Sequence, residues 1–113
     1  MSAAFSQGEL ITVNFDPSTR HEPQKRRPAV VASTDQFNAR LSSLMVVCPI
    51  TSIDNGHPLH IRIAEGNPAT GFICVEQMRS IDCTIRDAKS LDADLDFDTM
   101  DKVLTVIGAV FGI

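Results

Sequence analysis

The alternation of hydrophobic and polar residues along the chain predicts a series of β-strands. In the segment GELITVNF (8–15), the residues Ile11, Val13 and Phe15 alternate with polar ones, as in a strand with one buried face. A short apolar segment at 28–33 predicts the next strand. The beginning of the chain is therefore typical of a β-sheet protein.

Three later segments continue this pattern. Residues 43–51 are apolar enough for a central strand, and 71–82 predict one long or two short strands. Residues 59–64 alternate cleanly, so we expect His60 and Arg62 on the outward side of a strand.

The end of the chain follows a helical period instead. Apolar residues recur there at steps of three and four, at Phe97, Met100, Val103, Leu104, Ile107, Val110 and Phe111. Asp96 is a favourable N-cap for this helix, and 34–40 could form one helical turn. Residues 16–26 contain two prolines and no periodicity, which predicts a long loop. The expected fold is mainly β: a small, largely antiparallel β-barrel closed by a C-terminal α-helix.

Length and composition favour one cytoplasmic domain. The chain has 113 residues, so we expect a single domain over 1–113. No segment approaches the roughly 20 apolar residues that cross a bilayer, and the N-terminus has no signal-peptide core. Cys48, Cys74 and Cys83 are odd in number and have no C-x-x-C spacing, which favours buried thiols over a disulfide framework or a zinc site.

Net charge at first argues against a nucleic-acid partner, because the chain carries −4. However, five of the fourteen acidic residues lie within 92–101, where they suit the start of the final helix. The loop and strand around 20–40 contain more basic than acidic residues. A local basic surface is therefore compatible with the composition.

Several residue types at the strand ends could carry chemistry. The guanidinium of Arg27 is a planar fork that suits a phosphate, although a structural ion pair is the alternative. Thr51 and Ser52 place two hydroxyls at a strand end, where they could also cap a turn. Among His21, His57 and His60, nothing in the spacing pairs two imidazoles as the acid and base of a metal-free ribonuclease. Sequence motifs for metal or nucleoside-triphosphate chemistry are absent.

Four blocks follow one another along the chain: GELITVNFDP, then KRRPAVVAS preceded by a glutamate, then CPITS followed by GHP, and finally EQMRSID. In this order they resemble the MazF/PemK family of toxin endoribonucleases. The resemblance covers residues 8 to about 90. It implies an SH3-like β-barrel of the CcdB/PemK type. It also implies a cytosolic homodimer that cuts single-stranded RNA without a metal or other cofactor and leaves 2′,3′-cyclic phosphate and 5′-hydroxyl ends. A cognate antitoxin would silence it.

The resemblance also implies roles for individual residues. The catalytic arginine of the family's R-P motif matches Arg27, the hydroxyl of its P-x-T block matches Thr51, and the loop glutamate matches Glu22. Because arginine is a poor base at neutral pH, Glu22 is the better candidate for deprotonating the 2′-hydroxyl. The expected RNA-binding residues are Lys25, Arg26, Ser52, His57 and Gln77. An acidic antitoxin tail is expected to occupy the groove around Arg26 and Arg27.

The chain departs from the family pattern at several positions. Thr12 and Cys83 stand where the family often has Trp, Glu76 replaces its Asp, and His57 replaces the aromatic of its turn. Because Trp and Tyr are absent, base stacking would fall to Phe or Arg, and the recognised RNA sequence cannot be transferred.

Two alternatives remain at this point. The tail 111–113, Phe-Gly-Ile, is similar to the Trp-Gly-Ile end through which CcdB-type toxins poison DNA gyrase. The chain could also be a barrel of the same family that has lost activity.

Overall fold

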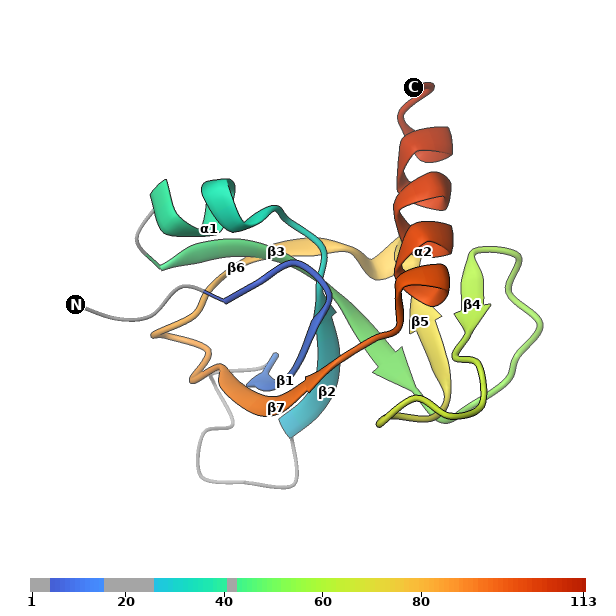
Figure 1. Cartoon of the computed structure of the whole chain (residues 1–113), viewed down its shortest axis with the longest axis horizontal. Helices are drawn as coiled ribbons and strands as arrows, with labels where there is room; N and C mark the ends of the chain where they lie inside the picture. Colours follow the sequence, from blue (N-terminus) through green and yellow to red (C-terminus); the bar gives the residue numbers. More distant parts are fainter. Residues whose placement is uncertain (1–4, 16–25, 41–42) are drawn as a thin grey trace.

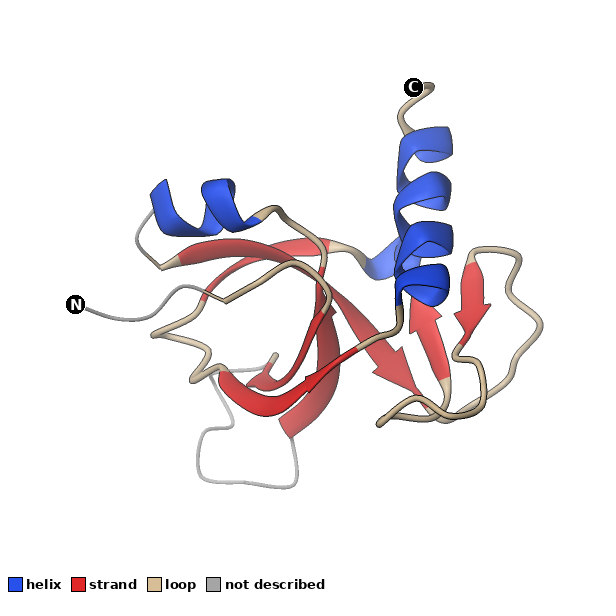
Figure 2. Ribbon diagram, viewed as in Figure 1, coloured by secondary structure: helices blue, strands red, loops and turns tan. Residues whose placement is uncertain are grey.

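Seven β-strands form a twisted antiparallel sheet that curls into a barrel, and two α-helices lie against it (Figures 1 and 2). The computed structural model describes residues 5–15, 26–40 and 43–113. The elements are β1 (Glu9–Asn14), β2 (Arg26–Val31), α1 (Asp35–Arg40), β3 (Leu44–Thr51), β4 (His60–Arg62), β5 (Phe72–Cys74), the 3₁₀ turn η3 (Val75–Gln77), β6 (Arg79–Asp82), β7 (Lys89–Asp94) and α2 (Phe97–Val110).

Strand β3 connects the two parts of the sheet. Its first half pairs with β6 and β2, and its last residues pair with β5, so the strand order is β4-β5-β3-β2-β1-β7 with β6 also paired to β3. Val47 pairs with Val31 of β2 on one edge and with Arg79 of β6 on the other, so β6 and β5 follow each other along the same edge of β3, opposite β2. Pro49 lies inside β3, buried and opposite Ala29 of β2. The end of β3 therefore leaves the barrel and forms a small three-stranded sheet with β5 and β4 (Figure 1).

Two apolar clusters occupy the two faces of the sheet. The barrel core contains Ile11, Val13, Ala29, Val31, Met45, Val47 and Ile81. The helix-covered core lies on the other face, where Met100 and Val103 of α2 pack against residues such as Leu10, Val30, Ile50 and Ile73. Strand alternation places successive residues in different clusters, which is why both faces of β1 to β3 are apolar.

The expected strands at 8–15, 28–33 and 43–51 are confirmed to within about two residues, and 71–82 forms two short strands separated by η3. Asp96 caps α2, because its Oδ1 accepts a hydrogen bond from Thr99 N at 2.9 Å. Strand β7 was not predicted, since its sequence KSLDAD is mostly exposed and has little apolar alternation.

Two sequence-based expectations of burial are wrong. The apolar stripe of α2 is buried only in its middle: Phe97 is 80 % exposed, Val110 50 % and Phe111 63 %. The C-terminal end of the helix extends beyond the sheet (Figure 1), which explains the exposure of Val110 and Phe111. His60 was expected on the outward side of its strand, but its side chain is only 5 % exposed. Neither helix in the described part of the chain is long and apolar enough to span a membrane.

Candidate active site

Strand register brings the main candidate residues into one row across the sheet. Arg62 of β4 pairs with Phe72 of β5, and Phe72 pairs with Thr51 of β3. Directly paired residues point to the same face, with Cβ atoms about 4.5–5.5 Å apart, so Arg62, Phe72 and Thr51 form a row on one face. On the other side of β3, the pairing with β2 ends at Pro49 opposite Ala29. Arg27 and Thr51 each lie two residues beyond this last pair, at the same end of the two neighbouring strands.

This face is the continuation of the barrel core. Arg27 pairs with Val13, which is buried in that cluster, while Arg27 itself is exposed. At this end of the barrel the apolar residues give way to polar ones, so the row faces solvent. Among the described residues, none forms a hydrogen bond or ion pair with the Arg27 side chain. Its guanidinium is therefore available to a ligand.

The Cys74 thiol lies within the electrostatic reach of Arg27. Burial and the negative charge of Glu76 raise the pKa of the Cys74 thiol, whereas the positive charge of Arg27 lowers it. On β5, Cys74 lies two residues beyond Phe72, the residue that pairs with Thr51. Arg27 thus acts electrostatically across β3, onto the small sheet of β4 and β5. Burial raises the pKa of Cys48 to about 12, so neither of these thiols is a ready nucleophile.

The neighbouring Arg26 has a different environment. Its guanidinium donates to Thr12 O at 3.0 Å, Thr12 Oγ1 at 2.8 Å and Asp87 O at 2.7 Å, and it forms an ion pair with Asp87 Oδ2 at 3.0 Å. These contacts tie β2 to β1 and to the turn before β7. The donors of Arg26 are thus used within the protein, and its role here is structural, which leaves Arg27 as the accessible cation of the R-P motif.

Thr51 offers a hydroxyl at the point where β3 ends. Its Oγ1 accepts a hydrogen bond from Ile53 N at 3.2 Å, so the hydroxyl proton remains free to be donated. Ser52 follows and is exposed. Gly71 lies against the Thr51 backbone: a Cβ at Gly71 would come within 2.4 Å of Thr51 O, and its φ of +115° favours glycine. This close approach fixes the position of Thr51.

Next to this row, two histidines stack beside a carboxylate. The rings of His57 and His60 lie 5.0 Å apart at an angle of 20°, and His60 Nε2 is 2.8 Å from Glu76 Oε2. Leu59 N donates to His57 Nδ1 at 3.1 Å, which places the proton of a neutral His57 ring on Nε2. Burial acts to raise the pKa of Glu76, but the hydrogen bond from His60 and the charges of both rings bring it below its ordinary value. His57 is the partly exposed member of this cluster and His60 the buried one.

The same three side chains could hold a metal ion, since their ligand atoms lie within 4.8 Å of one another. Zinc bonds of about 2.0–2.1 Å require both rings to aim a lone pair at one point. Nearly parallel stacked rings do not do this, and the His57 Nδ1 lone pair already accepts from Leu59 N. The present arrangement therefore fits a hydrogen-bonded cluster better than a metal centre.

The remaining expected residues are less informative. Gln77 is exposed, and its Nε2 lies 3.5 Å from Glu76 Oε2, at the edge of the same cluster. Glu22 and Lys25 lie outside the described residues, so the proposed base and one RNA-binding candidate have no structural account.

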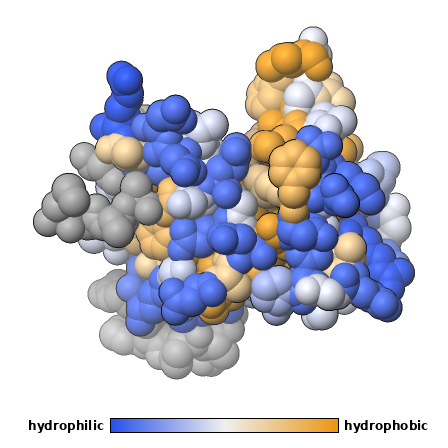
Figure 3. Space-filling view, in the orientation of Figure 1, coloured by the Kyte–Doolittle hydropathy of each residue, from blue (hydrophilic) through white to orange (hydrophobic). Residues whose placement is uncertain are grey.

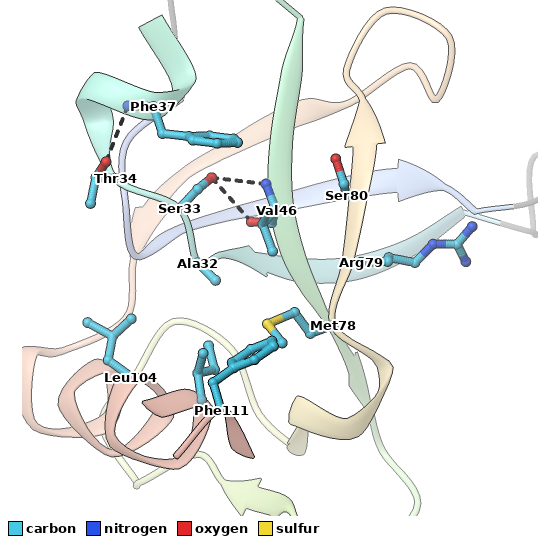
Figure 4. A pocket seen from close by; sticks show the side chains of 11 residues that line it. Ala32, Ser33, Thr34, Phe37, Val46, Met78, Arg79, Ser80, Leu104 and Phe111 are labelled. Carbon is cyan, nitrogen blue, oxygen red and sulfur yellow. Dashed lines mark hydrogen bonds between the residues drawn. The ribbon is translucent and has the colours of Figure 1, made fainter. Parts of the chain in front are cut away.

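A hollow lies on the opposite, helix-covered side of the sheet. It has a volume of about 500 Å³, and its lining is mostly apolar. Figure 4 shows Phe37 of α1 and Phe111 after α2 approaching it from two sides, while the Arg79 side chain extends away. The exposed apolar surface at the end of α2 is visible in Figure 3, where Val110, Phe111 and Ile113 contribute. This hollow provides mainly apolar contact surface.

Sequence reasoning did not identify Phe72 and Arg62 as site residues, and it did not pair the histidines. Nothing in the local sequence marks Phe72, because its importance comes from pairing with Thr51 across the sheet. The spacing H-P-L-H could have raised the histidine pair, but the partner Glu76 is sixteen residues away. Only the pairing of β4 with β5 brings these groups together.

Comparisons with known proteins identify the family and agree with the fold. A family described as "PemK-like, MazF-like toxin of type II toxin-antitoxin system" matches residues 6–111. The endoribonuclease toxin ChpB of Escherichia coli K12 is 32 % identical over 112 residues, covering 94 % of this chain and 93 % of ChpB. The endoribonuclease PemK of E. coli is 34 % identical over 91 residues, covering 76 % and 67 %. In the MazE–MazF crystal structure from Deinococcus radiodurans, a similar chain has a TM-score of 0.81 at 28 % identity, with 99 % of each chain covered.

Proposed function

Because the chain belongs to the family of PemK-like, MazF-like toxins of type II toxin–antitoxin systems, we propose that it cleaves single-stranded RNA with Arg27 and Thr51. The observation that carries the proposal is that Arg27 and Thr51 lie at the same end of the neighbouring strands β2 and β3, each two residues beyond their last pair, Ala29 and Pro49. The alternative of a gyrase poison acting through the C-terminal tail is not favoured, since the curated relatives are named endoribonucleases.

The reaction that fits these residues is an internal transfer at one phosphodiester. The RNA 2′-oxygen attacks its own phosphorus, the P–O5′ bond breaks, and the products carry a 2′,3′-cyclic phosphate and a 5′-hydroxyl. Negative charge builds on the phosphoryl oxygens in the transition state. Arg27 supplies two parallel N–H donors and a positive charge, and Thr51 supplies one O–H donor. A single well-placed donor of this kind typically contributes a factor of about 10²–10³ in rate.

Two protons have to move in this reaction: one leaves the 2′-hydroxyl and one reaches the departing 5′-oxygen. Glu22 remains the proposed base, on the strength of the family resemblance. Ser52, His57 and Gln77 are proposed to contact the RNA around the scissile phosphate, and Lys25 to add positive charge nearby. The position of His57 in the cluster with His60 and Glu76 supports this assignment, because its side chain is partly exposed and its Nδ1 already accepts from Leu59 N, which leaves Nε2 for a ligand.

Partners follow from the family. The D. radiodurans relative is a MazE–MazF complex, and we propose that this chain likewise has a cognate antitoxin. An acidic antitoxin tail would compete with RNA for Arg27. We also propose a homodimer in the cytoplasm; the exposed Phe111 and Val110 support a pairing surface. Replacing Phe111 by Asp should then shift the protein towards monomers in analytical ultracentrifugation.

The direct test is cleavage of a long, weakly structured RNA in EDTA, followed by mapping of the cut ends. We expect discrete cuts with 2′,3′-cyclic phosphates from the wild type and a loss of at least about 10²-fold in Arg27→Ala. Arg40→Ala, which removes another exposed arginine, on α1, should cut like the wild type. Intact RNA with folded wild-type protein, or equal cutting by Arg27→Ala, would refute the proposal.

A further inference from the structure

We propose that the cavity beside Thr51, lined by Phe72 and Arg62, binds a nucleobase adjacent to the scissile phosphate. This inference rests on the proposed ribonuclease function and adds a substrate subsite to it. The occupant is a base with an exocyclic amino group, stacked on the Phe72 ring, whose own phosphate is held by Arg62.

The cavity is placed correctly for this purpose. Thr51, Phe72 and Arg62 occupy successive strands at one register position, so the order from the reaction centre outwards is hydroxyl, phenyl ring and guanidinium. Neighbouring strands lie about 4.7–4.9 Å apart. Two strand spacings, roughly 9–10 Å, therefore separate Thr51 from Arg62 across the row.

The size and shape of the cavity suit a single base. Its volume is about 500 Å³, and its lining includes Ser52, Asp54, Arg62, Asn67, Gly71 and Phe72. Pockets for small molecules typically have about 300–1,000 Å³. Phe72 is half-buried, which leaves part of its ring accessible, and Gly71 has no side chain to obstruct the approach to it.

The charges of the lining distinguish a base from a free phosphate. Asp54 and Glu65 carry negative charge into the cavity and would repel an anion inside it. Asp54 Oδ1 already accepts from Gly56 N at 3.1 Å, but its other oxygen remains an acceptor for an exocyclic amino group. Adenine, cytosine and guanine have such a group and uracil does not. The inference therefore predicts discrimination against uracil at this position.

Arg62 completes the subsite at the rim. It is exposed, and within the described ranges no residue forms an ion pair or a hydrogen bond with its side chain. Its guanidinium can take a backbone phosphate while the base enters the cavity. Asn67, by contrast, is engaged: its Nδ2 donates to Ala64 O at 2.9 Å and its Oδ1 accepts from Asp96 N at 2.8 Å. Asn67 thus holds the shape of the cavity and does not read the base.

The composition favours a phenylalanine platform. The chain contains neither Trp nor Tyr, so base stacking on an aromatic ring falls to its six Phe and three His residues. Phe72 is the one that register pairs directly with Thr51.

A double-mutant cycle between protein and RNA tests the inference. The cut sites of the wild type are mapped first, and substrates are then made with one abasic nucleotide on either side of the cut. Phe72→Leu removes the aromatic face but keeps an apolar side chain, and Phe72→Tyr keeps the face as a matched control. We expect Phe72→Leu to lower kcat/KM by about fivefold or more on intact RNA. It should have no further effect when the abasic nucleotide is at the subsite position.

Arg62→Gln provides a second measurement. Loss of one phosphate contact on a single strand should reduce the slope of log affinity against log salt by about 0.7. Circular dichroism melts have to match the wild type for each variant. Two results together overturn the subsite. The effects of Phe72→Leu and of the abasic nucleotide are additive at every position, and the salt slope of Arg62→Gln is unchanged. If the wild type cuts while Arg27→Ala does not, that result leaves the proposed function intact; a wild type that cuts no RNA overturns both.

Discussion

Replacing Gly71 by Ala should destabilise the protein and displace Thr51 at the same time. The added Cβ would lie 2.4 Å from Thr51 O, about 0.6 Å closer than the 3.0 Å that real Cβ contacts respect. Gly71 also has a φ of +115°, which is unfavourable for alanine. Because the obstructing atom is backbone, neither side can yield by a simple rotamer change.

Two costs combine in this variant. Backbone strain of this kind typically costs about 1–3 kcal/mol, and overpacking adds roughly 1–3 kcal/mol. Gly66→Ala is the matched control, since Gly66 lies in the same hairpin with a φ of +93° but has nothing within 4 Å of the added Cβ. We therefore expect Gly71→Ala to lose about 1–3 kcal/mol more unfolding free energy than Gly66→Ala.

Urea unfolding gives these free energies, and cleavage of a defined RNA by the folded fraction gives the catalytic effect. A displacement approaching 1 Å at a catalytic group can cost up to about 10²-fold, so we expect the rate of Gly71→Ala to fall by tenfold or more. Equal destabilisation of the two glycine variants, with the wild-type cleavage rate retained in Gly71→Ala, would refute the idea that this contact positions Thr51.

Two further perturbations address neighbouring residues. Arg26→Ala should reduce the unfolding free energy by about 1–3 kcal/mol in urea titrations, because it removes charge-assisted hydrogen bonds to Thr12 and Asp87; a stability equal to that of the wild type would contradict its structural role. For Glu76, the folded pKa lies below the ordinary value of 4.5, so its ionised form stabilises the fold above pH 4.5 and this contribution is lost as the pH falls through the lowered pKa. Glu76→Gln should therefore flatten the acid limb of the stability–pH curve between about pH 5 and 3, and an unchanged curve would contradict the interaction with His60.

The sequence predicted the elements whose signal is local. Alternation over 8–15 and the three- and four-residue steps after Asp96 depend on residues a few positions apart, and both elements are present. Strand β7 escaped prediction because it pairs with β1 through its backbone and buries little of its own side chains. The exposed ends of α2 were unpredictable for a related reason: periodicity gives the apolar face of a helix but not the length of the surface that covers it.

The site residues also differ in how far the local sequence could predict them. Arg27 and Thr51 could be selected from sequence because each belongs to a short block with a known family counterpart. Arg26, adjacent in the same block, could not be distinguished from Arg27, since strand alternation turns the two side chains to opposite faces and only one face carries Thr12 and Asp87. A contact between distant segments decided which of the two cations remains available.

The path of β3 connects the fold to the chemistry. For its first part this strand buries Met45 and Val47 in the barrel core, and beyond Pro49 the same face carries Thr51 out of the barrel. The side chains that alternate with these on β3 stay in the helix-covered core, where Ile50 is 4 % exposed. One face of β3 thus anchors the end of the strand in a packed core, and the other face presents Thr51 to solvent. The hydroxyl proposed to be catalytic is therefore held by packed backbone, which is the condition for donors whose position has to match a transition state rather than a substrate.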